Sequence, residues 1–103
     1  MIKVTVLYPN SEDARFDMTY YTGKHMPMVQ KMCGPACKSA AAELGLSGGE
    51  PHSRPLYIAF GHLTFDSVEA FQNSFVPHAA EILADAKNFT NTGATLQISE
   101  ITL

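Results

Sequence analysis

His25 and Tyr21 are the two residues whose types and spacing could support chemistry. They stand four residues apart, so on a helix they would share one face. A histidine titrates near neutral pH and can serve as a general acid or base, and a neighbouring phenol can bind a carbonyl or phenolate oxygen. The alternative is structural, because Pro27 frees backbone carbonyls that His25 could satisfy. The residues themselves leave both interpretations open.

A helix over residues 17–32 is predicted to carry this pair. Asp17 is a suitable N-cap, and Phe16 before it can pack on Tyr21. Pro27 cannot donate to the carbonyl of Gly23, so we expect the helix to kink or break between these two residues. Three- and four-residue steps place one set of mostly apolar side chains on a common face: Met18, Tyr21, His25, Met28 and Met32.

Four segments alternate in the manner of β-strands, namely 2–8, 37–46, 56–65 and 95–103. A second helical region is expected to begin at the cap Asp66 and to be interrupted at Pro77. The order β-α-β-β-α-β predicts a single domain over 1–103 with an α+β, ferredoxin-like fold, in which two helices cover one face of a four-stranded antiparallel sheet. Segment 56–65 is apolar on both faces, so the face of the sheet without helices must also be buried. We expect a second copy of the chain to bury it in a homodimer.

Composition excludes several classes of partner. The 103-residue chain has a formal net charge of −3 and no Lys/Arg cluster, so nucleic acid is not an expected partner. No apolar run approaches the roughly 20 residues of a membrane helix, so no membrane partner is expected. The N-terminus alternates like a strand and has no cleavage signal, which predicts a cytoplasmic location. Cys33 and Cys37 lack the spacing of redox or zinc motifs and are expected to be reduced.

Two stretches of the chain resemble the EthD-like family. They are Phe16-Asp17-x-x-Tyr20-Tyr21-x-x-Lys24-His25-Met26-Pro27-Met28-Val29 and Ala86-Lys87-Asn88-Phe89-Thr90-Asn91…Leu96-Gln97-Ile98-Ser99-Glu100. The resemblance implies ferredoxin-like subunits that form a dimeric α+β barrel, and the family's namesake is encoded with an ethyl tert-butyl ether degradation system. The wider superfamily includes cofactor-free oxygenases, muconolactone isomerases, haem proteins and aldoxime dehydratases. The resemblance therefore predicts the fold more closely than the chemistry.

The resulting hypothesis is a homodimer that binds a small hydrophobic organic compound in a cleft between the first helix and the sheet. His25 and Tyr21 are the expected catalytic residues of a cofactor-free oxygenation, isomerisation or decarboxylation, in catabolism or secondary metabolism. The expected ligand-binding residues are Tyr8, Met28, Phe60 and His62. The alternatives are a non-catalytic accessory, carrier or sensor protein, a purely structural dimer, and a haem protein or a metal site of His25, His62 and His78. The histidine spacing is irregular, so no metal and no cofactor is expected.

Overall fold

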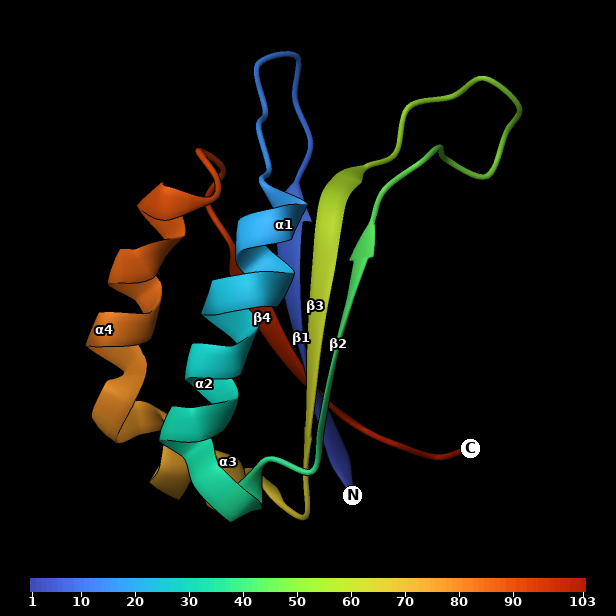
Figure 1. Ribbon diagram of the computed structural model, residues 1–103. Helices are drawn as coiled ribbons and strands as arrows, with labels where there is room; N and C mark the ends of the chain where they lie inside the picture. The colour runs from blue at the N-terminus through green and yellow to red at the C-terminus, as the bar shows by residue number, and fades with distance from the viewer.

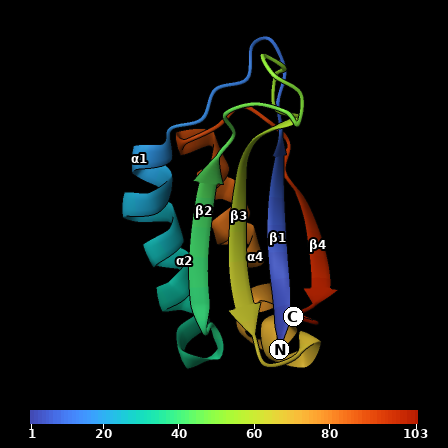
Figure 2. The same ribbon diagram turned by 90° about the vertical axis from the view of Figure 1, so that its right-hand side faces the viewer.

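The computed structural model describes residues 1–103, which form one antiparallel sheet with helices on one side (Figure 1). The strands lie in the order β2-β3-β1-β4. Their bounds are Ile2–Pro9 for β1, Ser39–Leu44 for β2, Tyr57–Phe65 for β3 and Thr95–Glu100 for β4. Figure 2 looks onto the face of the sheet that no helix covers. The predicted α+β, ferredoxin-like fold is confirmed, with β2 and β4 shorter than expected.

The first helix runs without interruption through α1 (Met18–Tyr20), a π-helical turn (Tyr21–His25) and α2 (Met26–Cys33). The Asp17 carboxylate accepts a hydrogen bond from the Tyr20 amide at 3.0 Å, which confirms the predicted cap. The rings of Phe16 and Tyr21 pack edge to face with centroids 4.9 Å apart. The helix ends at Gly34, whose positive φ of 66° is a backbone conformation that glycine adopts far more easily than other residues.

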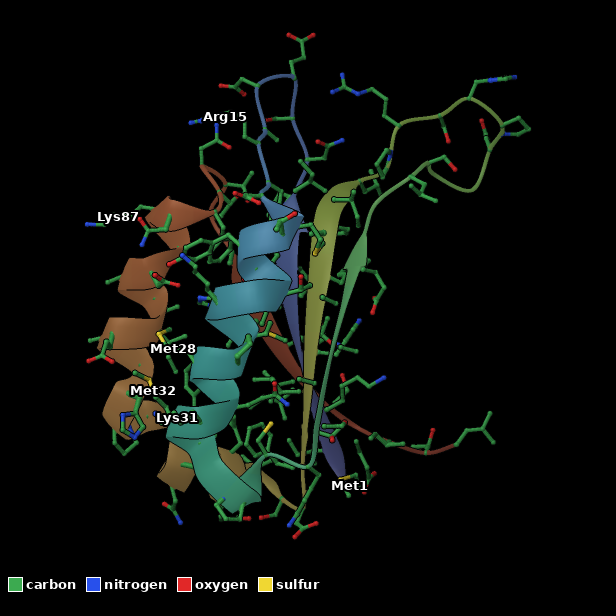
Figure 3. The ribbon with its side chains drawn as sticks, viewed as in Figure 1. Met1, Arg15, Met28, Lys31, Met32 and Lys87 are labelled. Atoms are coloured by element: carbon green, nitrogen blue, oxygen red, sulfur yellow. The ribbon has the colours of Figure 1, made fainter.

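The predicted discontinuity near Pro27 takes the form of a π turn. The amide of Met26 donates to the carbonyl of Tyr21, five residues earlier, so this turn holds one more residue than an α-helical turn. The extra residue rotates every later side chain about the helix axis, relative to its place in a regular α-helix. The positions expected on the inner face, Met28 and Met32, are half-buried instead, and Val29 and Cys33, each one residue later, are buried. Figure 3 shows Met28 and Met32 projecting from α2 on the side of α4.

The second helical region consists of α3 (Val68–Phe75) and α4 (Ala79–Ala84), joined and followed by short 3₁₀ turns at Val76–His78 and Asp85–Asn88. Its N-cap is Ser67, whose hydroxyl accepts from the Ala70 amide at 3.1 Å, and not Asp66 as expected. The helix starts one residue later than predicted because Ser67 still has an extended backbone. Asp66 instead lies 3.7 Å from Lys38 across the surface.

Alternation along the strands divides the sheet into an inner face, packed on the helices, and an outer face. The central strands carry the core on the inner face, including Val4, Ala59, Leu63 and Phe65, each at most 3% exposed. Residues 58, 60, 62 and 64 of β3 lie on the outer face and are half-buried. None of the helices has the length and apolarity needed to cross a membrane.

Candidate functional site

His25 lies at the end of the π turn and is paired with Asp85, which begins the 3₁₀ turn after α4. The Nδ1 atom of His25 is 2.8 Å from Oδ2 of Asp85, and the histidine is only 5% exposed. The other carboxylate oxygen of Asp85 accepts hydrogen bonds from the Tyr20 hydroxyl at 2.8 Å and the Asn88 amide at 2.9 Å. Three donors therefore hold this carboxylate in one orientation against the imidazole.

The charge state of Asp85 determines which nitrogen of His25 is available. Burial acts to raise the pKa of Asp85, but hydrogen bonds from His25, Asn88 and Tyr20 outweigh it and hold the pKa below its ordinary value. An ionised carboxylate can only accept, so Nδ1 carries the proton of this bond. In the neutral imidazole, Nε2 is then the basic nitrogen. Nε2 has no hydrogen-bond partner within the chain. Because no fully buried polar side-chain atom lacks a partner, Nε2 is not completely enclosed, and His25 itself lines a cavity.

Two buried phenols lie beside this histidine. The ring of Tyr21 stacks on His25 with centroids 5.3 Å apart and an interplanar angle of 16°. The hydroxyl of Tyr8 donates to the Tyr21 oxygen at 3.3 Å. Burial raises the pKa of both phenols, so they remain neutral near neutral pH. Since Tyr21 accepts from Tyr8, its own proton is free to be donated to a group in the cavity.

The Tyr21 hydroxyl occupies the space that a side chain would fill at Gly61 on β3. A Cβ atom added at Gly61 would overlap the Tyr21 oxygen. The backbone of Gly61 has no positive φ, so this position requires glycine for space and not for conformation. The phenol of Tyr21 therefore packs directly against the backbone of a central strand, and this contact fixes the orientation of the ring.

A cavity of about 50 Å³ lies between the first helix, the inner face of the sheet and α4. Apart from His25, the thioether of Met26 and the phenols of Tyr8 and Tyr21, its side chains are aliphatic or phenyl groups, among them Val29, Leu63 and Phe89. The rings of Phe89 and His25 are 4.6 Å apart, so Phe89 holds the imidazole from a second side. The arrangement can exclude water from a base and a hydrogen-bond donor that face the same apolar space.

The structure brings together three of the six residues expected to form the site and places three elsewhere. Tyr8, Tyr21 and His25 line the cavity. Met28 does not, and Met26 lines it instead, because the π turn rotates α2. Phe60 and His62 lie on the outer face of the sheet and cannot reach this cavity, because successive strand residues point to opposite faces.

Asp85 is the member of this candidate site that the sequence does not indicate. It lies 60 residues after its partner, and no local spacing connects the two. The available signal was its position directly before the stretch 86–91, which the family resemblance had already singled out. A carboxylate next to that stretch was a reasonable candidate partner for the histidine.

A second histidine network lies on the outer face. The Nε2 atom of His62 is 2.7 Å from Glu43 on β2, and its Nδ1 is 3.2 Å from the Thr5 hydroxyl on β1. His25 and His62 are thus on opposite sides of the sheet. No group of three or more His, Cys, Asp or Glu side chains is arranged to hold a metal ion.

Comparisons with known proteins agree with this architecture. The chain is 34% identical to an uncharacterized 11.0 kDa protein from the thcB–thcC intergenic region of Rhodococcus erythropolis, over 97% of this chain and 94% of that protein. It is similar to the crystal structure of an EthD-like protein from Ralstonia eutropha JMP134, with 43% identity, a TM-score of 0.94, and coverage of 99% of this chain and 92% of the other. An ethyl tert-butyl ether degradation (EthD) family protein from Bacillus halodurans C-125 shares the fold, with 21% identity, a TM-score of 0.73 and 99% of each chain covered.

The family model described as the EthD domain matches residues 10–93. The match includes Tyr21, His25 and Asp85, and so covers the whole histidine–carboxylate pair. The chain belongs to the EthD domain family.

Proposed function

We propose that this protein binds a small, largely apolar organic molecule whose carbonyl or phenol group enters the cavity, and that His25 abstracts a proton from it. The observation that carries the proposal is the pairing of His25 Nδ1 with Asp85, which leaves Nε2 as the basic atom of a histidine that lines an apolar cavity. Such a carboxylate orients the imidazole and stabilises the imidazolium that forms on proton transfer.

Tyr21 is the proposed partner for the charge that develops. When a proton leaves carbon or oxygen of the ligand, negative charge accumulates on its oxygen, and the neutral Tyr21 hydroxyl can donate to that atom. Tyr8 supports this role because its own hydroxyl donates to the Tyr21 oxygen and thereby directs the Tyr21 proton away from Tyr8. Neither phenol ionises near neutral pH, so both act only through hydrogen bonds.

These groups favour an isomerisation over the other candidate reactions. His25 can return the proton that it takes to a different atom of the ligand, which completes an isomerisation without any cofactor. An oxygenation would in addition consume O₂. A decarboxylation would bring a carboxylate into a cavity that no Arg or Lys lines, and burying an unpaired charge is unfavourable.

A second copy of the chain is the proposed cover for the outer face of the sheet. Leu7, Ile58 and Phe60 lie on this face without a helix above them, and each is half-buried. Pairing of two such faces would remove this apolar surface from water. Sedimentation of the protein at several concentrations should give twice the chain mass, and a monomer at all concentrations would refute the homodimer.

The test of function compares three variants against a panel of phenols and enolisable ketones. His25→Ala removes the imidazole, and His25→Gln keeps an amide that can donate to Asp85 but cannot act as a base. His52→Asn is the matched control, because His52 is exposed in a loop and its φ of 63° is tolerated by asparagine. Turnover is expected to fall by about 10² to 10⁴ in both His25 variants and to persist in the control.

Two other outcomes would contradict the proposed catalytic function. Ligand-dependent thermal stabilisation without turnover in the wild-type protein would favour the accessory or carrier role. Turnover in His25→Gln equal to that of the wild-type protein would remove His25 from the chemistry.

A further inference from the structure

The cavity beside His25 is too small for a whole organic ligand. Its volume is about 50 Å³, whereas a closed apolar cavity that accepts benzene has about 150 Å³. Only a few non-hydrogen atoms fit beside the imidazole and the Tyr21 hydroxyl. The remainder of any larger ligand must therefore pass through the mouth of the cavity.

The mouth lies between α4 and β4. Leu83 of α4, Ala94 just before β4 and Leu96 of β4 line the same cavity as His25. Leu83 is 55% exposed and Leu96 is 41% exposed, so both also reach the surface. The cavity is consequently continuous with an apolar strip on the outside of the molecule.

This strip extends along the inner face of β4. Leu96 pairs with Val6 and Ile98 with Val4, so both side chains face the helical layer. Even so, Ile98 is 40% exposed, whereas Val4 beside it is fully buried, because the helices cover β1 and not the edge strand β4. We call the surface formed by Leu83, Ala94, Leu96 and Ile98 the β4 groove.

We propose that the β4 groove holds the uncharged, apolar tail of the ligand whose polar head meets His25 and Tyr21. This inference rests on the proposed function and adds a substrate class to it: a phenol or enolisable ketone that carries an alkyl chain. The groove residues are all aliphatic, so they offer nothing to a charged or hydrogen-bonding tail. Continuity with the His25 cavity distinguishes this surface from the outer face, which lies on the other side of the sheet.

A series of 4-alkylphenols with tails of zero to six carbons tests the proposal by calorimetric titration. Affinity should rise by about two- to fourfold for each methylene that enters the groove and then level off. Ile98→Gln should reduce this increase per methylene and leave phenol itself bound with its original affinity, because Ile98 lies in the groove but does not line the His25 cavity. Leu46→Gln is the matched control, because Leu46 is 89% exposed in the loop between β2 and β3.

Each outcome separates the groove from the proposed function. The proposal of a tail site in the β4 groove would be overturned if affinity does not depend on tail length, or if the dependence is equal in Ile98→Gln and the wild-type protein. A change of oligomeric mass in Ile98→Gln without a change in tail dependence would show that a second copy covers the groove, which also overturns the proposal. If affinity rises with tail length in the wild-type protein but His25→Gln turns over substrate as fast as the wild-type protein, the groove is supported and the proposed function fails.

Discussion

Gly61→Ala is the substitution with the most specific expected effect, because a single methyl group would occupy the position of the Tyr21 hydroxyl. The buried phenol has to move, since Tyr21 is 1% exposed and surrounded by Phe16, Phe89 and His25. Overpacking of this kind costs about 1–3 kcal/mol. Loss of the hydrogen bond from Tyr8 adds about 1 kcal/mol.

The free energy of unfolding should therefore fall by about 2–4 kcal/mol, measured by urea denaturation. For a chain of this size the corresponding decrease in Tm is roughly 10 to 25 °C. Gly49→Ala is the control, because nothing lies within 4 Å of a Cβ atom at that position, and its stability should stay within about 0.5 kcal/mol of wild type.

A second substitution tests the cause of this effect. Tyr21→Phe removes the oxygen that the new methyl group would overlap, although the Tyr21 Cζ atom would still lie 3.1 Å from it. The loss of unfolding free energy in the double variant should be smaller than the sum of the two single losses by about 1–2 kcal/mol. The reasoning is refuted if Gly61→Ala unfolds like the wild-type protein, or if the two effects are simply additive.

The remaining predictions concern the Asp85 network and the corrected helix cap. Hydrogen bonds lower the pKa of Asp85 in the folded state, so its contribution to stability is present above about pH 4 and is lost as pH falls through the folded pKa. Asp85→Asn should therefore weaken the dependence of the unfolding free energy on acid pH, measured by urea denaturation at a series of pH values. The hydrogen bond to Asp85 raises the pKa of Tyr20, so Asp85→Asn should shift the ultraviolet titration of this phenol to lower pH, and an unchanged titration would contradict the contact. Ser67→Ala should lower the free energy of unfolding by about 1 kcal/mol, whereas Asp66→Ala should have a smaller effect; the reverse order would restore Asp66 as the cap.

Much of the fold could be predicted because it depends on periodicity between near neighbours. Strand alternation is the clearest case, because residues 59, 61, 63 and 65 of β3 face the helices and residues 58, 60, 62 and 64 face away from them, as the alternation of neighbouring side chains requires. The Asp17 cap and the Gly34 stop were also predictable, since each depends on groups within one helical turn.

One helical register was not predictable from the same periodicity. An α-helical step of 3.6 residues placed Met28 and Met32 on the inner face, and the π turn before Pro27 moved Met26, Val29 and Cys33 there instead. Proline indicates that a backbone bond is missing. It does not indicate whether the helix will bend, break or widen, because that choice depends on what the neighbouring turns pack against.

The sequence by itself determined that Tyr21 and His25 would lie together on one helix beside a discontinuity, since helical geometry alone connects residues four apart. Only the tertiary structure decided what surrounds them. It supplied Asp85 from 60 residues away, opened space for the Tyr21 hydroxyl at Gly61, and placed Phe60 and His62 on the far side of the sheet. These contacts join separate elements, and their geometry is set by how the helices pack on the sheet, which no spacing within a single segment records.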